Sequence, residues 1–199
     1  MSFVLPISFY QREDVVQIAR DLLGKLLLTQ MNNQITGGII IETEAYKGAE
    51  DRACHAYNYR KTKRNLAMYR NGGITYIYLC YGIHHLLNVV THTEGVPHAV
   101  LIRAIFPTFG IKTMLKRRKK TSLNSKLTNG PGSVCQALGI NLTHNAIPLN
   151  SPCIWIANSD VSIDQTQIYQ GPRIGVDYAG QDALLPWRFK LEKLLLLKS

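Results

Sequence analysis

The middle of the sequence has no acidic side chains. Among 199 residues there are 13 Asp+Glu against 23 Lys+Arg, a formal net charge of +10, and none of the acidic residues lies between Glu94 and Asp160. Eight lysines and arginines fall in that interval. Positive charge that no nearby carboxylate offsets favours a polyanionic partner or surface.

The sequence also lacks the features of several protein classes. Its four cysteines are far apart and form no C-x-x-C pair, which argues against a zinc ribbon or a disulfide framework and favours a reducing, cytosolic setting. No apolar run approaches the ~18 residues that span a bilayer, and no basic stretch precedes an apolar one at the N-terminus. We therefore expect a soluble protein that is not exported.

Composition and hydrophobic spacing predict one α+β domain over residues 1–199. The chain is 46% hydrophobic and contains no repeat or low-complexity tract, which fits a single folded unit. Apolar residues recur at helical spacing over 14–23, and shorter helices are expected at 111–115 and 133–138. Strands are expected at 25–30, 36–44, 75–81, 98–105 and within 171–176.

Tyrosine is concentrated in one part of the chain. Seven of the ten tyrosines lie between residues 46 and 81, and four lysines and arginines lie within 60–64. Aromatic rings that stack on bases, together with cations that neutralise phosphates, are typical of nucleic-acid surfaces. The alternative is that the tyrosines fill a core and the cations form a solvated loop. Composition alone leaves both interpretations open.

An apolar run over 39–46 carries two carboxylates, Glu42 and Glu44, two residues apart and therefore on one face of a strand. One of them could act as a general base that activates water. Alternatively, both could lie on the solvent-facing side of an edge strand or pair with arginines. Their position in the run does not decide between these alternatives.

Several blocks of the sequence together point to a known family. They are Glu42-Thr43-Glu44-Ala45-Tyr46, Glu50-Asp51, His55, Arg64-Asn65, Thr75-Tyr76-Ile77-Tyr78, Tyr81-Gly82, Asn88, Leu101-Ile102-Arg103-Ala104, Gly130-Pro131-Gly132 and Cys135-Gln136-Ala137-Leu138. In residue type, order and spacing, from about residue 12 to 189, they resemble the alkyladenine-type 3-methyladenine DNA glycosylases, or methylpurine DNA glycosylases. The resemblance implies a curved, mostly antiparallel β-sheet with surrounding helices and a protruding β-hairpin that intercalates into DNA.

The resemblance also implies an activity. The family's enzymes are monofunctional glycosylases of base excision repair: they flip damaged purines out of double-stranded DNA and hydrolyse the N-glycosidic bond, leaving an abasic site. The implied substrates are alkylated or deaminated purines, namely 3-methyladenine, 7-methylguanine, hypoxanthine and ethenoadenine. The alternative from another class is a catalytically inactive nucleic-acid-binding module.

The resemblance assigns residues to the recognition of the damaged base. It implies that Tyr46 forms one wall of a base pocket and that His55 and Tyr78 form the other, with Asn88 near the base edge. A cationic alkylated purine would gain about 0.5–2 kcal/mol against the tyrosine faces. Tyr81 is expected to fill the gap left by the flipped nucleotide.

The resemblance assigns catalysis to Glu44, whose ionised carboxylate would hold the attacking water. Arg103 would position this water and keep Glu44 charged, and the main chain at Ile174 would contribute a further contact. Glu42 is then structural, although the reverse assignment is open. No lysine matches a Schiff-base nucleophile, so no lyase activity is expected, and neither a cofactor nor a metal ion is expected.

Arg64 and Asn65 are the candidates for DNA-backbone contacts, together with the basic run 116–120, which could equally be a solvated helix face. Lys63 departs from the family pattern, in which proline is common at this position. The expected partner is double-stranded DNA containing damaged purines. No interaction with a membrane is expected, and the chain is expected to be a monomer. It would lie in the cytoplasm, associated with the nucleoid if bacterial, or in the nucleus if eukaryotic.

Overall fold

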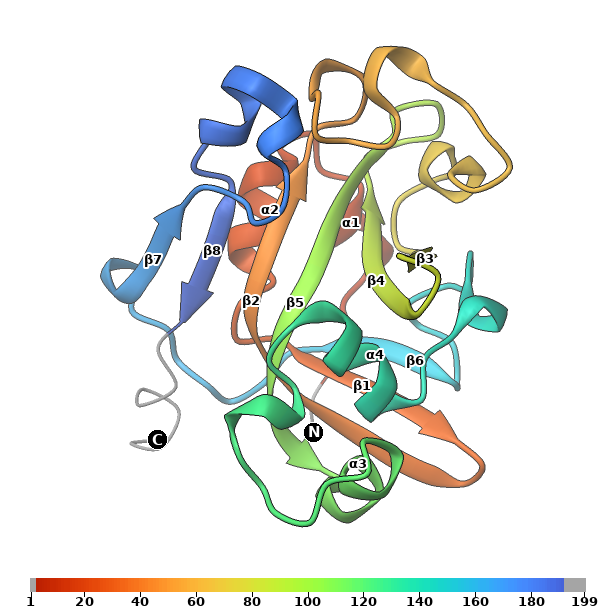
Figure 1. The fold of residues 1–199 in the computed structure, drawn as a ribbon, viewed down its shortest axis with the longest axis vertical. Helices are drawn as coiled ribbons and strands as arrows, with labels where there is room; N and C mark the ends of the chain where they lie inside the picture. Colours follow the sequence, from red (N-terminus) through yellow and green to blue (C-terminus); the bar gives the residue numbers. More distant parts are fainter. Residues whose placement is uncertain (1–2, 192–199) are drawn as a thin grey trace.

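Strand β2 (Gln34–Tyr46) is the central element of the sheet in the computed structural model, which describes residues 3–191 (Figure 1). Strand β5 (His98–Phe109) pairs along one side of it. On the other side, β1 (Leu26–Met31) pairs with the first half of β2 and β8 (Arg188–Leu191) pairs with the second half. The second half of β2 is therefore enclosed between β5 and β8.

The remaining strands extend this sheet. Their order is β3-β4-β5-β2-β1-β6, with β7 attached through β8, and every pairing between these strands is antiparallel. The further strands are β3 (Thr75–Cys80), β4 (His84–Thr91), β6 (Ile154–Ala157) and β7 (Ile168–Gly171). Because β1 and β8 both occupy the same edge of β2, the sheet curls instead of lying flat.

Within residues 3–191, four α-helices pack around this sheet: α1 (Ile7–Tyr10), α2 (Val15–Asp21), α3 (Ile111–Arg117) and α4 (Pro131–Leu138). The Asp14 side chain begins α2 by accepting hydrogen bonds from two main-chain N–H groups of its first turn, as N-cap residues do. Helix α2 buries its apolar face, and the Thr43 hydroxyl donates to the Ala19 carbonyl at 2.7 Å, fixing the helix against β2.

Short 3₁₀ helices connect the strands. They are η1 (Gly48–Glu50), η2 (Tyr57–Tyr59), η3 (Leu66–Tyr69), η4 (Ser125–Leu127), η5 (Leu142–His144), η6 (Gln165–Gln167) and η7 (Asp177–Leu184). The loops after β2 and the segment before β8 lie together at one end of the sheet, and α3 lies at the other end (Figure 1). A second apolar cluster, which includes Met68, Tyr69 and Tyr76, holds the loop after β2 against the sheet.

The fold agrees with most of the sequence-based expectations. The α+β class and the antiparallel sheet are confirmed, and so are the helix at 14–23 and the strands that became β1, β2, β3 and β5. The expected unit spans 1–199, of which residues 1–2 and 192–199 lie outside the described part. Among residues 3–191, no helix has the length and apolar character needed to cross a lipid bilayer.

The expectation of a strand within 171–176 is wrong, because β7 ends at Gly171. The backbone beyond it serves other partners: the Ile174 N–H donates to Glu44, and Gly175 has a φ of 76°. Strand β4 was not expected from the sequence. It pairs antiparallel with β3, and Tyr81 lies in the connection; whether this connection enters DNA stays a prediction.

Gly38 marks a place where β2 and β5 approach too closely for a side chain. A Cβ atom there would lie 2.2 Å from the Phe106 carbonyl oxygen, which belongs to a paired strand and cannot give way alone. We expect Gly38→Ala to destabilise the protein by about 1–3 kcal/mol, or roughly 2–12 °C in Tm for a domain of this size. Thermal denaturation measures this, with Gln34→Ala at the exposed start of β2 as control; equal Tm values would contradict the prediction.

Candidate active site

Glu42 and Glu44 lie side by side on the enclosed half of β2, and Arg103 connects them. The Arg103 Nε atom donates to Glu42 Oε1 and its Nη1 atom donates to Glu44 Oε2, both at 3.2 Å. Arg103 falls at a register shift of β5, between residues paired with Glu42 and Thr43. Such a bulge redirects a side chain, and here it allows one guanidinium to reach both carboxylates.

Glu44 is fully buried and its two oxygens have three donors. The Ile174 N–H donates to Oε1 at 2.8 Å, and the Tyr46 hydroxyl donates to Oε2 at 2.9 Å alongside Arg103. Burial raises the pKa of Glu44 above its ordinary value of 4.5, although the Arg103 charge and these hydrogen bonds oppose the shift. A carboxyl group with a raised pKa is better matched to proton transfer near neutral pH than an ordinary one.

Glu42 has a different environment. It is 5% exposed, and its Oε1 atom accepts from Arg103 and from Arg188 Nη1, the latter at 3.1 Å. The alternative that both carboxylates lie on a solvent-facing edge strand is therefore wrong, and the alternative of pairing with arginines holds. Because Glu42 is held by two arginines on neighbouring strands, its contacts suit a structural role.

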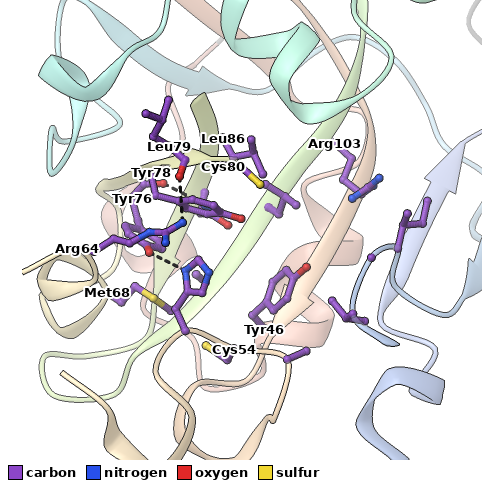
Figure 2. A pocket seen from close by; sticks show the side chains of 18 of the residues that line it. Tyr46, Cys54, Arg64, Met68, Tyr76, Tyr78, Leu79, Cys80, Leu86 and Arg103 are labelled. Carbon is purple, nitrogen blue, oxygen red and sulfur yellow. Dashed lines mark hydrogen bonds between the residues drawn. The ribbon is translucent and has the colours of Figure 1, made fainter. Parts of the chain in front are cut away.

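A cavity of about 540 Å³, a volume typical of small-ligand sites, is lined by the three residues that hold Glu44, namely Tyr46, Arg103 and Ile174. Glu44 itself is fully buried behind them and is not part of the lining. The cavity lining includes the following predicted residues: Tyr46, His55, Arg64, Tyr78, Tyr81, Asn88, Arg103 and Ile174. Figure 2 shows the Tyr46 ring on one side of the cavity and the Tyr76 and Tyr78 rings on the other. The structure therefore brings together aromatic residues from β2, from β3 and from the loop after β2.

His55 completes the wall opposite Tyr46. Its Nδ1 atom lies 2.8 Å from the Tyr76 hydroxyl, and its ring meets the Tyr78 ring edge-on with centroids 4.6 Å apart. Burial, with the nearby Arg64 and Arg60 charges, lowers the pKa of His55 to about 4. The imidazole is therefore neutral near neutral pH and would not repel a cationic base.

Tyr46 is supported from behind by Arg173, whose Cζ atom lies 4.8 Å from the ring centroid. Arg173 is 4% exposed and forms two hydrogen bonds with the Asp51 carboxylate, one of them at 2.8 Å. Arg173 also donates to the Ala45 carbonyl at 2.9 Å. The Tyr46 wall thus depends on an ion pair that lies outside the cavity.

Asn88 lies on β4 directly opposite Tyr76 and is 4% exposed. Its amide nitrogen donates to the Tyr76 carbonyl at 3.1 Å. This contact fixes Asn88, which lines the cavity.

Tyr81 is 90% exposed at the end of the β3–β4 pair. Its φ is 50° and that of Gly82 is 72°, so two consecutive residues occupy the left-handed region, as in a type I′ hairpin turn. A bulky aromatic residue is an outlier in that region. Folding alone does not favour an exposed, left-handed tyrosine, so its position is consistent with a role outside the fold.

The two predicted DNA-backbone residues differ in exposure. Arg64 is exposed, donates to the Leu79 carbonyl at 3.1 Å and lies 4.7 Å from the Tyr78 ring centroid. Asn65 is 1% exposed, and its amide binds the loop itself through the Arg60 carbonyl at 2.8 Å and the Thr62 N–H at 2.7 Å. Direct phosphate contact does not fit this position of Asn65, which we assign to holding the loop.

The basic run 116–120 is not brought to the cavity. Helix α3 lies at the start of β2, where Thr113 contacts Gln34, whereas Tyr46 ends the same strand roughly 40 Å away along it at about 3.3 Å per residue. Arg117 is also engaged internally, with Thr36 and Ala137. Within residues 3–191, no group of three or more His, Cys, Asp or Glu side chains could hold a metal ion.

Sequence reasoning gave no role to three residues that build the site: Asp51, Arg173 and Arg188. The first two are 122 positions apart and lie in loops, where hydrophobic periodicity gives no information. The one available signal is a carboxylate close to the predicted site, within Glu50-Asp51.

Comparison with known proteins agrees with this geometry. The family model described as "Methylpurine-DNA glycosylase (MPG)" matches residues 8–194. The chain belongs to this family. It is therefore a DNA glycosylase, an enzyme that hydrolyses N-glycosyl bonds in DNA.

Similar curated proteins occur in several bacteria, and each is named as a candidate 3-methyladenine DNA glycosylase. A Chlamydia felis protein is 55% identical over 189 residues, which cover 94% of this chain and 96% of that protein. A Chlamydia pneumoniae protein is 53% identical over 92% of each chain. A Bacillus cereus protein is 42% identical over 94% of this chain and 95% of its own length. The recognition of the family from sequence motifs is confirmed.

Removing the Asp51 charge should test the support behind Tyr46. Asp51→Asn leaves the buried Arg173 guanidinium without its carboxylate, which typically costs about 3–5 kcal/mol. The matched control is Glu50→Gln, which breaks the exposed Lys47–Glu50 pair in the same loop and should leave the free energy of unfolding nearly unchanged, because exposed ion pairs are screened by solvent. Chemical denaturation measures both. Equal losses of unfolding free energy in the two variants would contradict the prediction that the buried Asp51–Arg173 pair contributes more to stability than the exposed Lys47–Glu50 pair.

Proposed function

We propose that this protein removes damaged purines from duplex DNA by hydrolysis, with Glu44 as the residue that activates water. One observation carries this proposal: a fully buried carboxylate with a raised pKa is held by Arg103, Tyr46 and the Ile174 N–H, and these three residues also line an aromatic cavity. A base bound in that cavity would present its sugar to Glu44. The names of the relatives support the substrate class.

The cavity is suited to a flat base. A purine would stack between the Tyr46 ring and the wall formed by Tyr78 and His55, with Asn88 at its edge. Alkylated purines such as 3-methyladenine and 7-methylguanine are cationic, and the aromatic faces with a neutral His55 accept that charge. Hypoxanthine and ethenoadenine are neutral, and we propose that edge contacts and weak pairing select them.

Glu44 has two functions in this mechanism. As a carboxylate it accepts a proton from the attacking water, and its negative charge stabilises the oxocarbenium-like sugar. Arg103 and the Tyr46 hydroxyl hold the carboxylate in place. The Ile174 N–H donates directly to Glu44, so we propose that it positions the carboxylate instead of contacting only the water.

The base must first leave the duplex, which requires unstacking. We propose that Tyr81 enters the gap, because it is the most exposed large hydrophobic residue in the described part of the chain and lines the mouth of the cavity. The abasic strand would remain intact, since the mechanism uses water and no amine nucleophile. We further propose that the protein acts as a monomer on cytoplasmic, nucleoid DNA.

Substituting Glu44 should separate catalysis from binding. Glu44→Gln keeps the shape but removes the base and the negative charge, so single-turnover release of 3-methyladenine or hypoxanthine should fall by at least about 100-fold with lesion binding retained. Glu42→Gln, in the same strand and beside the same arginine, is the matched control and should lose far less. The reverse order of losses would make Glu42 the base. Tight binding without release by the unmodified protein would indicate a catalytically inactive module.

The pH dependence of base release should report the protonation of Glu44. Because the water-activating form is the carboxylate and burial raises the pKa of Glu44, the rate of base release should fall as pH decreases, with a midpoint above 4.5. His55 does not contribute near neutral pH, since its pKa is about 4. Single-turnover rates over a pH series, with His55→Gln as control, measure this; a midpoint at or below 4.5 would contradict it.

A further inference from the structure

A second recess, of about 300 Å³, adjoins the aromatic cavity, and its walls are cationic. It is lined by Arg52, Cys54, His55, Tyr57, Arg60, Thr62, Arg64, Asn65 and Tyr178. Three of these side chains are guanidinium groups and none is a carboxylate. Cys54, His55, Arg64 and Tyr178 line both spaces, so the recess and the cavity share one wall.

The recess arginines differ from the arginines near the carboxylates. Arg103, Arg173 and Arg188 each form an ion pair with Glu42, Glu44 or Asp51. Over residues 3–191, Arg52, Arg60 and Arg64 form no ion pair with a carboxylate.

A nearby carboxylate does contact one of these residues, but through its main chain. Asp182 accepts from the Arg52 main-chain N–H at 2.8 Å. The pKa of the Arg52 guanidinium is raised mainly by Tyr57 and to a smaller extent by the Asp182 charge. Asp182 is not part of the recess lining. Three neighbouring cations without a carboxylate among them repel one another, and an anion would relieve this repulsion.

The loop that presents Arg60 and Arg64 is held in place. The Arg60 carbonyl accepts from the Asn65 amide at 2.8 Å and from the Tyr69 hydroxyl at 2.9 Å. Thr62 is bound to the same Asn65 side chain. The chain turns sharply just before, where Asn58 and Tyr59 have φ values of 53° and 57°. A loop fixed in this way loses little conformational entropy when an anion binds.

We propose that this recess binds the DNA phosphate directly adjacent to the extruded nucleotide. The assignment rests on the proposed function, because a base in the aromatic cavity places its own phosphates at the shared wall. Guanidinium groups are suited to phosphate, since their planar N–H donors match two oxygens at once. Arg64, on the shared wall and against Tyr78, would contact both the nucleotide and its phosphate.

Duplexes in which one linkage is an uncharged methylphosphonate test this assignment. Each carries one hypoxanthine, and the neutral linkage is placed immediately 5′ or 3′ of it, or several base pairs away. Loss of one charged hydrogen-bonded contact corresponds to a decrease of roughly 10–100-fold in kcat/KM. We expect this decrease for one adjacent linkage and little change for the distant one.

Arg60→Met and Arg52→Met supply the other half of the experiment. Each should lower kcat/KM on the ordinary duplex but cause little further loss on the duplex with the neutral adjacent linkage, because the partner is already absent. Lys120→Met, beyond the end of α3, is the control and should leave this coupling unchanged. Unaltered Tm values would show that the variants fold.

Additive losses from the arginine variants and the neutral adjacent linkage would overturn the proposal. So would equal losses from all linkages, which indicate a general electrostatic effect. Inorganic phosphate that binds at the arginines while the linkage effect stays additive would indicate a free-anion site instead. Binding of the same duplexes by Glu44→Gln provides a readout independent of excision, so a protein that releases no base would refute the proposed function and still test the recess.

Discussion

The buried ion pair between Asp51 and Arg173 is the interaction on which the rest of the site depends. It joins the loop that follows β2 to the loop that precedes β8. On one side Arg173 supports the Tyr46 ring, and one residue later the Ile174 N–H reaches Glu44. The Asp51–Arg173 pair therefore helps to position both the Tyr46 ring and the Glu44 carboxylate. The same contact ends the regular backbone, since residues beyond Gly171 serve Asp51 and Glu44 instead of continuing β7.

Such a pair is not an efficient way to stabilise a protein, because two charges must lose their hydration. The Arg173 Nε atom also has no hydrogen-bond partner in the described part of the chain. An apolar pair could fill the same volume, but it could not place an N–H group on Glu44 or a cation behind Tyr46. The same argument applies to Glu42, Arg103 and Arg188. Their hydrogen bonds fix the orientation of the Arg103 guanidinium, which apolar packing alone would not determine. The site combines buried charges, a left-handed Tyr81 and a bulge at Arg103, all of which depart from ideal local structure, as functional sites commonly do.

These departures also explain what could be predicted from the sequence. Helix α2 has a cap at Asp14 and an apolar stripe, and β2 has a continuous apolar run, so local rules suffice for both. The segment 171–176 has the composition of a strand, but its partners are Asp51 and Glu44, more than a hundred residues away, and no local pattern records them. Asn65 was assigned to DNA because of its place in a motif. Its burial against Arg60 and Thr62 depends on the path of a loop, which spacing does not reveal. The resemblance to the family, by contrast, named eight of the residues that line the cavity, namely Tyr46, His55, Arg64, Tyr78, Tyr81, Asn88, Arg103 and Ile174, whereas their roles stay predictions.

Charge is distributed unevenly across the site. Around Glu44, Glu42 and Glu44 face Arg103 and Arg188, and Asp51 faces Arg173, so each of these cations has a carboxylate beside it. In the adjoining recess, Arg52, Arg60 and Arg64 form no ion pair within residues 3–191. Three guanidinium groups therefore face three carboxylates around Glu44, whereas three guanidinium groups without a carboxylate line the recess. An alkylated purine nucleotide has the opposite arrangement, with a cationic ring at one end and an anionic phosphate at the other. Under the proposed function, a nucleotide that enters base first would bring its phosphate to the recess arginines and its cationic ring toward the buried carboxylates.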